Sequence, residues 1–398
     1  YQVKEYLGSA AFSKAVQCLD LHTGEMVCIK IIKNNKDFFD QSLDEIKLLR
    51  YMRKHDPRDE HHVLRMYDYF YHREHLFLVC ELLRDNLYEF SRFNRDSGGE
   101  RYFQLPRLRR IAKQCLEALV FVHRLGLIHC DLKPENILIS SLTACKIKVI
   151  DYGNAYLHHD QRCSYVQSRA YRAPEVVLGL AYSPKVDLWS LGCILMELYT
   201  GKLLFDNRSV QALLASHIAV LGPLPRSLLR EGALTDHYFA DQSDAAQLRN
   251  GLVGKQEGRL CRMRPRKTSI AMILAANGCD DPQLVSFITE LVQPDPNLRP
   301  DAKRALNHPF LEGCAEECPP YRLTEADSQV EAGLRLLQKY TSLNDSHSGD
   351  GRSPHASGGM TLLGEEAGTH GPATPTAFRE QCYMNRERLE KKRARKSG

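Results

Sequence analysis

The fold of this chain is decided by the stretch His129-Cys130-Asp131-Leu132-Lys133-Pro134-Glu135-Asn136, which Asp151-Tyr152-Gly153 follows after a short strand. At this spacing the chain offers one candidate base, Asp131, and one lysine, Lys133, that can neutralise phosphate charge. Asn136 and Asp151 add oxygen-bearing side chains of the kind that bind magnesium. Transfer of a phosphoryl group to a hydroxyl requires this set of groups. The structural alternative, in which the same residues only form turns and caps, does not account for their order.

A second set of charged residues lies near the N-terminus. Lys30, in the strand-like run Val27-Cys28-Ile29-Lys30, can reach the α- and β-phosphates of a nucleotide. Glu45, on the amphipathic helix expected next, is the carboxylate that would hold this lysine in place. A random Lys/Glu pair is more often two solvated surface charges, but the strand context and the downstream motifs favour a pair in the site.

The nucleotide-loop signal is weaker and rests on the stretch Leu7-Gly8-Ser9-Ala10-Ala11-Phe12-Ser13-Lys14-Ala15. It keeps one of the three glycines expected in G-x-G-x-x-G-x-V, because Ala10 and Ser13 occupy the other two positions and Ala15 replaces the valine. Taken alone, the stretch would fit any two strands joined by a turn. Its position two strands before Lys30 is what connects it with a nucleotide.

An activation and substrate-binding loop is expected in the stretch Tyr165-Val166-Gln167-Ser168-Arg169-Ala170-Tyr171-Arg172-Ala173-Pro174-Glu175. Glu175 is expected to form a structural ion pair with Arg299 near the end of the domain. The guanidinium groups of Arg169 and Arg172 can bind a phosphate carried by Tyr165. The charge-assisted hydrogen bonds would then order the loop.

The composition is that of an ordinary globular chain. Of 398 residues, 43% are apolar and 26% are charged, and no apolar run reaches the length of a membrane span. The 13 cysteines show no paired spacing, which favours a reducing compartment, in the cytoplasm or the nucleus or both, and gives no support to a zinc site. The chain begins at Tyr1 without a methionine, so the lack of an N-terminal signal carries no information.

The apolar patterns predict a strand-rich N-terminal part and a helical remainder. Strands are expected near 3–7, 15–21, 26–33, 63–71 and 75–82, and an amphipathic helix over 38–54. Helices are expected after Pro106 and near 187–200, 208–221, 283–293 and 300–306, which would close the domain at about Leu311. We further expect a partly helical extension over 312–340, a disordered linker over 341–380 and a basic tail over 381–398.

The basic tail carries the net charge of the chain. Seven Lys and Arg residues against Glu387 and Glu390 give residues 381–398 a charge of +5, which equals the charge of the whole chain. The rest is therefore about neutral, so a nucleic-acid partner is not expected on the fold. The run from Lys391 to Lys396 is compatible with a nuclear-import signal and with a simple solvated end.

These motifs together resemble the eukaryotic protein kinase family over residues 1–311. Lys133, two places after Asp131, is similar to the serine/threonine branch. Cys130, with the stretch Tyr165-Val166-Gln167-Ser168-Arg169, resembles the dual-specificity tyrosine-regulated (DYRK) kinases of the proline-directed CMGC superfamily. The stretches Phe38-Phe39-Asp40-Gln41-Ser42-Leu43-Asp44-Glu45 and Asn86-Leu87-Tyr88-Glu89-Phe90 look closest to plant-type members.

The resemblance implies an α+β bilobal fold. It implies a small β-rich N-lobe with one helix over 1–82, a larger, mostly helical C-lobe over 83–311, and an insert over about 221–282. It also implies ATP and Mg2+ as cofactors. Adenine-pocket residues carried over from the family are Cys28, Cys80 at the gatekeeper position, Glu81, Leu83 and Leu138, with Val16 as a further lining residue.

Phosphorylation of protein Ser and Thr hydroxyls, after autophosphorylation of Tyr165, is the activity that the resemblance implies. It also implies a proline-directed preference, and we expect a monomer with no membrane partner. Ala10, Ser13, Ala15 and Tyr152 leave open the alternative of a pseudokinase scaffold that binds partners without catalysis. A nucleic-acid-binding protein is the third candidate and rests on the basic tail alone.

Overall fold

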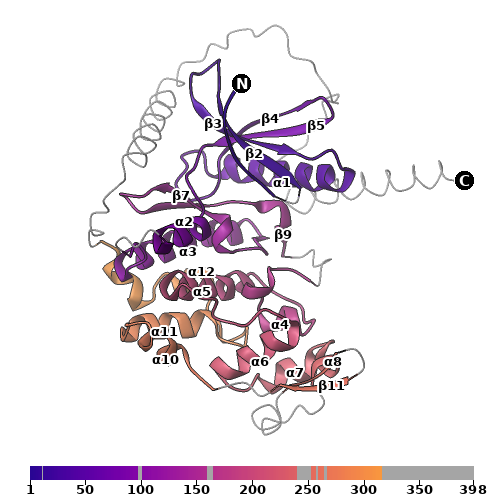
Figure 1. Ribbon diagram of the computed structural model, residues 1–398, viewed down its shortest axis with the longest axis vertical. Coiled ribbons are helices and arrows are strands. Elements are labelled where there is room, and N and C mark those ends of the chain that lie inside the picture. Colours follow the sequence, from indigo (N-terminus) through magenta and orange to yellow (C-terminus); the bar gives the residue numbers. More distant parts are fainter. Residues whose placement is uncertain are drawn as a thin grey trace, which may run out of the picture. The chain divides into compact units, whose positions relative to one another are not determined.

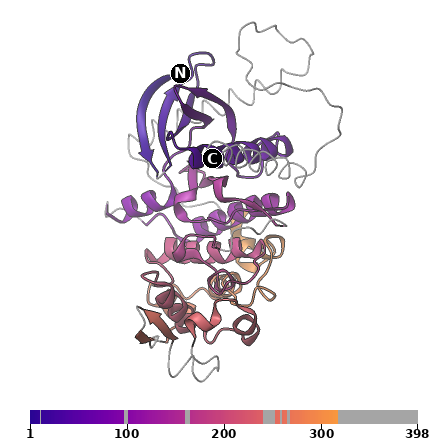
Figure 2. The same ribbon diagram turned by 90° about the vertical axis from the view of Figure 1, so that its right-hand side faces the viewer.

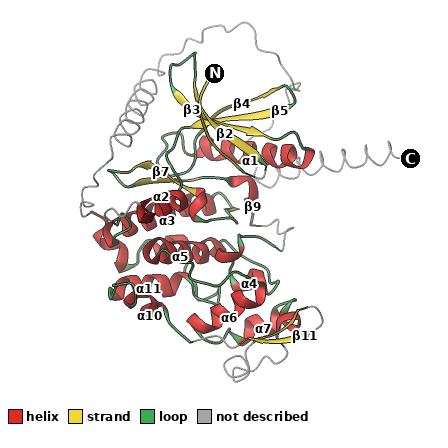
Figure 3. Ribbon diagram, in the orientation of Figure 1, coloured by secondary structure: helices red, strands yellow, loops and turns green. Residues whose placement is uncertain are grey.

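Strands gather in the N-terminal part of the chain and helices in the remainder (Figures 1 and 3). The computed structural model describes residues 1–10, 12–96, 101–158, 165–239, 252–256, 259–263 and 267–315. This arrangement, with an N-terminal antiparallel sheet and a helical C-terminal part, confirms the predicted α+β bilobal fold. The expected extension beyond residue 315, the linker and the basic tail lie outside the described residues.

The N-lobe sheet is antiparallel, with strand order β1-β2-β3-β5-β4. Its strands are β1 (Gln2–Ser9), β2 (Ser13–Leu19), β3 (Met26–Ile32), β4 (Met66–His72) and β5 (His75–Glu81). Because side chains alternate along a strand, β3 sends Val27 and Ile29 to one face, where they pack with Cys18 and Val79. Lys30 is therefore turned to the opposite face, toward the helix of this lobe.

That helix is α1 (Lys36–His55), which the periodicity predicted over 38–54. Asn35 caps its start, since the side chain accepts hydrogen bonds from the backbone N–H groups of Asp37 and Phe38. The buried stripe contains Ile46, Leu49 and Met52, which join the main apolar core. Glu45 lies on the same stripe, so the helix carries a carboxylate into the interior.

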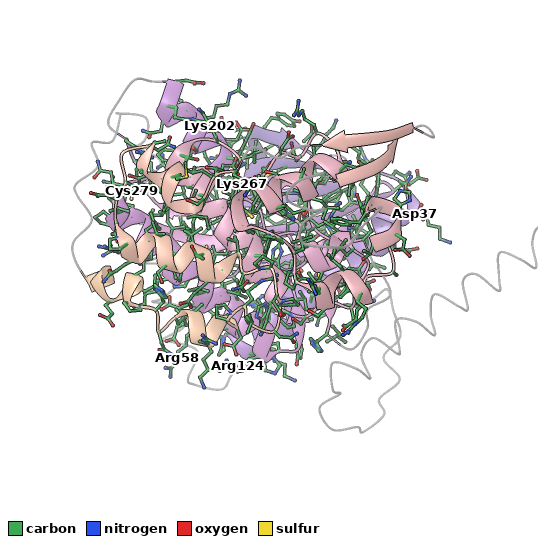
Figure 4. The ribbon with its side chains drawn as sticks, turned by 90° about the horizontal axis from the view of Figure 1, so that it is seen from below. Asp37, Arg58, Arg124, Lys202, Lys267 and Cys279 are labelled. Carbon is green, nitrogen blue, oxygen red and sulfur yellow. The ribbon has the colours of Figure 1, made fainter. Side chains whose placement is uncertain are left out.

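The C-lobe is built around α5 (Lys185–Thr200), which is apolar on nearly its whole circumference and buried along most of its length. Gly192 lets this helix approach its neighbour closely, because a Cβ there would lie 2.6 Å from Val292 Cγ1. The other helices are α2 (Leu87–Asp96), α3 (Leu105–Arg124), α4 (Pro174–Val177), α6 (Val210–Leu221), α7 (Arg226–Glu231), α8 (Thr235–Tyr238), α10 (Ile270–Ala275), α11 (Pro282–Leu291) and α12 (Ala302–Ala305). The view from below shows side chains filling the space between these helices (Figure 4).

Short strands between the sheet and α5 flank the loops that contain the His129–Asn136 and Asp151–Gly153 motifs. β6 (Leu127–Ile128) pairs with β9 (Tyr156–Leu157), and β7 (Ile137–Ser141) pairs with β8 (Lys146–Val149). The turned view places them between the sheet and the helices (Figure 2). A further hairpin, β10 (Leu252–Gln256) with β11 (Arg259–Met263), falls in the expected insert. Within the described part of the chain, no helix combines the length and apolar character of a membrane span.

Within the described part of the C-lobe, one buried histidine lacks the hydrogen bonds that a buried polar side chain usually makes. His217 on α6 packs edge-on against Trp189 and Phe205, with ring centroids 4.9 and 4.5 Å away. Neither ring nitrogen has a hydrogen-bond partner among the described residues. Burial, with a smaller contribution from the nearby Arg299 guanidinium, lowers the pKa of His217 to about 3. The imidazole is therefore neutral in the folded protein at any ordinary pH.

This histidine should make the domain sensitive to acid. The unfolded chain binds a proton at His217 near pH 6.5, about the ordinary pKa, whereas the folded chain does not. Protonation of His217 in the unfolded chain therefore does not affect the free energy of unfolding above about pH 6.5. Below that pH it lowers the free energy of unfolding by about 1.4 kcal/mol per pH unit. Urea unfolding of the wild type and of His217→Phe, compared at about pH 7.5 and about pH 5.5, checks this. We expect the variant to lose less stability on acidification, and equal losses would contradict the assignment.

Candidate active site

Lys30 and Glu45 form a buried ion pair between the sheet and α1. The Lys30 ammonium donates to both carboxylate oxygens of Glu45, at 3.0 Å to Oε1 and 2.8 Å to Oε2. The same Nζ lies 3.8 Å from Asp151 Oδ1. Burial alone would lower the pKa of Lys30, but the two carboxylates outweigh it and hold that pKa above its ordinary value. Lys30 therefore stays charged in the site, as the sequence predicted for a phosphate anchor.

The loop that contains Asp131 is fixed to α5 by a single carboxylate. Asp187 is fully buried and accepts hydrogen bonds from the backbone N–H groups of His129 and Cys130, at 2.9 and 3.0 Å. The ring of His123 lies 2.8 Å from the same carboxylate. Burial would raise the pKa of Asp187, but these donors lower it overall. The loop backbone is therefore held in register with the central helix.

Asp131 is oriented by side chains on both of its carboxylate oxygens. Lys133 Nζ donates to Oδ2 at 2.7 Å, and the Ser168 hydroxyl donates to Oδ1 at 2.7 Å. Asn136 Nδ2 donates to the Asp131 carbonyl at 2.8 Å, which directs the amide oxygen of Asn136 away from that backbone. The predicted base, the predicted lysine and one predicted metal ligand are therefore adjacent.

Asp151 has the properties of a cation ligand. Its backbone is in the left-handed region, with φ of 64°, which is unusual for a residue other than glycine. Its Oδ1 is buried and accepts no hydrogen bond from any described residue. An orphaned carboxylate oxygen beside Lys30, together with the amide oxygen of Asn136, fits magnesium, which takes few protein oxygens and completes its shell with phosphate and water.

The Tyr152 side chain lies in the core. Its side chain is fully buried, stacks edge-on with His129 at 5.1 Å between ring centroids, and donates a hydrogen bond to the Val149 carbonyl at 3.4 Å. Its hydroxyl therefore has the partner that a buried phenol needs. The tyrosine at this position is therefore accommodated within the core.

The β1–β2 turn forms a closed hairpin above Lys30. Gly8 pairs with Ala15 across the two strands, and Ala10 N–H donates to the Ser13 carbonyl at 2.8 Å. Leu7 is exposed, whereas the Ser13 side chain is buried, and the contacts of this turn with a nucleotide stay predictions. The Phe12 ring, for which the sequence predicted no role, has its centroid 4.9 Å from Lys30 Nζ.

The residues predicted to line an adenine pocket lie on β3, at and after the end of β5, and on β7. Cys28 on β3 lies directly opposite Cys80 on β5. The Glu81 carboxylate is engaged elsewhere, because it accepts hydrogen bonds from Lys148 Nζ and from the Arg65 N–H, both at 2.7 Å. Its side chain is therefore unavailable to adenine. Leu83 follows, and Leu138 on β7 is joined to this segment by an isolated bridge to Asn86.

The loop after Asp151 brings one of the two predicted arginines to Tyr165. The Arg172 guanidinium carbon lies 3.8 Å from the centroid of the Tyr165 ring, and its buried Nη1 has no hydrogen-bond partner among the described residues. Arg169 Nη1 donates to the carbonyls of Asn207 and Arg208. The predicted pair of Glu175 with Arg299 is confirmed, with two contacts of 2.6 and 3.0 Å.

The sequence also predicted no role for three polar residues that support the site. Ser168 touches the base directly, Gln167 supports the loop, and Gln41 links α1 to Gly153 through a hydrogen bond of 3.3 Å to its carbonyl. Ser168 and Gln167 stand within the quoted loop, but nothing in their residue types distinguishes them from neighbouring polar residues. Gln41 stands one helical turn before Glu45, and this spacing was the available signal.

Comparison with known proteins agrees with this site. The family described as "Protein kinase domain" matches residues 1–311. The chain is 37% identical to the "Probable serine/threonine-protein kinase dyrk2" of Dictyostelium discoideum over 311 residues, which are 78% of this chain and 33% of that protein. It is 37% identical to the "Dual specificity tyrosine-phosphorylation-regulated kinase 2" of Drosophila melanogaster over 315 residues, which are 79% of this chain and 42% of that protein.

A human relative gives the same result. The "Dual specificity tyrosine-phosphorylation-regulated kinase 4" of Homo sapiens is 35% identical over 311 residues, which are 78% of this chain and 57% of that protein. The aligned part of the chain therefore spans between a third and just over half of the length of these three relatives.

Lys30→Met should abolish phosphoryl transfer and leave the fold intact. The methionine fills the space but cannot hold a phosphate, and loss of one such charged contact typically lowers the rate by about 100- to 1000-fold. The unpaired Glu45 can take up a proton, which limits the cost to stability. Radioactive transfer from ATP, with circular dichroism as the check on folding, measures both effects. Lys47→Met, on the outer side of α1, is the matched control and should keep its rate; unchanged turnover in Lys30→Met would remove the anchoring role.

Proposed function

The chain belongs to the protein kinase family, in the branch of the DYRK kinases, and on this premise we propose that it transfers the γ-phosphoryl group of ATP to serine and threonine hydroxyls of proteins. The observation that carries the proposal is that four separate segments supply the candidate groups and are joined to one another. Lys30 on β3 contacts Glu45 on α1 and Asp151 after β8. The loop after β6, which carries Asp131 and Lys133, is joined to the segment before Asp151 by a hydrogen bond from the Ile150 N–H to the Asn136 carbonyl.

Each residue has a distinct task in the proposed reaction. ATP would supply the phosphoryl group, and Asp151 and Asn136 would hold Mg2+, which would offset the phosphate charge. Lys30 holds the nucleotide's phosphates in place through its charge. Asp131 orients the acceptor hydroxyl and takes its proton. Lys133, which is 2.7 Å from Asp131, is close enough to offset charge on the transferring group as well.

The scaffold alternative finds little support in this geometry. A chain that only binds partners has no need for a buried lysine held between two carboxylates, because such charges cost stability to bury. The Tyr152 hydroxyl, one motivation for that alternative, is accommodated in the core. Ala10 and Ala15 alter the nucleotide loop but leave the catalytic groups untouched.

A preference for proline after the acceptor residue is supported by the backbone at Gln167. This residue lies at φ of 66°, and its amide group bonds to Tyr171, Val186 and Ser190, which holds the strained conformation. Arg172 occupies the carbonyls of Val166 and Gln167, with contacts of 2.9 and 2.6 Å. These carbonyls, next to Ser168 and the base, are then unavailable to a substrate N–H. Proline has no N–H and loses nothing there.

Autophosphorylation of Tyr165 is supported by the environment of its ring. The side chain is 55% exposed and therefore accessible to transfer. Arg172 lies against it with one unpaired guanidinium nitrogen, which a phosphate oxygen would satisfy with a charge-assisted hydrogen bond. Such a bond would fix the loop that carries Gln167 and Ser168, and so connects the modification with substrate binding.

The main test is transfer to a peptide. We expect purified protein with magnesium and ATP to phosphorylate a peptide that has serine followed by proline, and the same peptide with alanine after serine to react at least about tenfold more slowly, which corresponds to 1.4 kcal/mol. Asp131→Asn keeps the shape of the side chain but cannot accept the proton, so it should lose nearly all activity. Activity in the wild type no higher than in Asp131→Asn would refute the enzymatic function.

Tyr165→Phe should lower activity several-fold by removing the phosphate that Arg172 would bind. Mass spectrometry of the expressed protein is expected to find phosphate on Tyr165, and none there in Asp131→Asn. Tyr88→Phe changes another exposed tyrosine, on α2, and serves as the control. Full activity in Tyr165→Phe, or an unmodified Tyr165 in an active preparation, would count against the proposal.

A further inference from the structure

Two cysteines face each other inside the proposed nucleotide pocket. Cys28 on β3 and Cys80 on β5 are direct partners in the antiparallel register, so their side chains point to the same face of the sheet. That face is the one that carries Lys30, two residues after Cys28. Both thiols are free, and Cys80 is 5% exposed. Among the described strand pairings, this is the only position where two cysteines are opposite each other.

The pairing of β3 with β5 sets the distance between the side chains of Cys28 and Cys80. Glu81 N–H bonds to the Arg65 carbonyl on the β4 side, and since groups alternate along a strand, the N–H and C=O of Cys80 point to β3. Cys28 and Cys80 are therefore a hydrogen-bonded pair, whose Cβ atoms lie about 5.5 Å apart in an ordinary sheet. A disulfide requires about 3.8 Å. A direct bond would distort the strands, whereas one atom placed between the sulfurs would not.

We propose that Cys28 and Cys80 form a dithiol site for a trivalent arsenic centre, and that its occupation excludes ATP. Arsenic forms two bonds to sulfur, and a bridge through it spans a wider gap between side chains than a disulfide. With an organoarsenic oxide, both As–S bonds form as the As=O bond breaks, and the two thiol protons leave with the oxygen as water. No oxidant or reductant is needed. The blocking of ATP rests on the proposed nucleotide site, but the binding of arsenic does not.

The protonation of the two thiols is consistent with this choice of ligand. Burial raises the pKa of Cys28 to about 11, and burial followed by the neighbouring Cys28 raises that of Cys80 well above its ordinary value. Reagents that need a thiolate, such as iodoacetamide, should therefore react slowly at neutral pH. An arsenic oxide accepts the protons in the reaction itself, so neutral thiols suffice.

A third cysteine provides a matched control. Cys18 on β2 is buried beside the same strands, but it packs with Val27, Ile29 and Val79 on the other face of the sheet. It is therefore as sheltered as Cys80 and lies away from the pocket. A variant at Cys18 tests whether any buried thiol of this lobe gives the effect.

Phenylarsine oxide is the probe. At a stoichiometric amount we expect intact-mass spectrometry to find one phenylarsenic group added with loss of two hydrogens, and a fluorescent ATP analogue to bind at least tenfold more weakly. Excess ATP should slow the addition, and 2,3-dimercaptopropanol should reverse it. Cys28→Ala and Cys80→Ala should each lose at least tenfold in arsenic affinity, while Cys18→Ala should behave as the wild type.

The outcomes separate the arsenic site from the proposed function. Addition to Cys28→Ala and Cys80→Ala with wild-type affinity would overturn the dithiol site, since the arsenic would then be held by other cysteines. No addition to the wild type would overturn it as well. Arsenic bound at the pair of a protein that shows no binding of the ATP analogue would leave the site standing and remove the nucleotide function instead. Arsenic bound at the pair with unchanged affinity for the analogue would overturn the exclusion of ATP.

Discussion

The structure depends on one constraint: a buried carboxylate must have donors, and Asp187 obtains them from the loop that carries the chemistry. Because Asp187 is fully buried on α5, its two oxygens need the N–H groups of His129 and Cys130. Meeting that need positions the next residue, Asp131, beside the cleft. Cys130 itself adopts φ of 64°, a strained conformation that these hydrogen bonds hold. A requirement of the core thus fixes the geometry of the base.

A second buried charge makes the N-lobe depend on the C-lobe. Lys30 is attached to α1 through Glu45 and approaches Asp151 at 3.8 Å, so the sheet, the helix and the end of β8 meet at one ammonium group. Displacement of α1 would leave charge unpaired in the interior, which costs about 3–5 kcal/mol when one partner of a buried pair is removed. A shift of α1 would therefore also remove the partner that holds Lys30 in the predicted nucleotide site.

Sequence patterns were sufficient to predict the fold class and to select the candidate site residues, because both rely on local spacing. Asp131, Lys133 and Asn136 lie within six residues, and the alternation that turns Lys30 inward is visible in β3 itself. Contacts made across the fold could not be predicted in the same way. The hydrogen bond from Ser168 to Asp131, the turn of Arg169 toward Asn207 and the register that opposes Cys28 to Cys80 all depend on strand pairing and loop path, which residue types do not specify.

The connection between the lobes is also fixed behind the proposed adenine pocket. Lys148 on β8 donates to Asp59, after α1, at 2.6 Å, and to Glu81 at 2.7 Å. Burial would lower the pKa of Lys148, but the two carboxylates raise it, so the lysine remains charged and cannot leave either partner without loss. The two lobes are thus joined by two charged contacts, Lys30 with Asp151 and Lys148 with Glu81. A movement of one lobe against the other must stretch both contacts, so each of them opposes it.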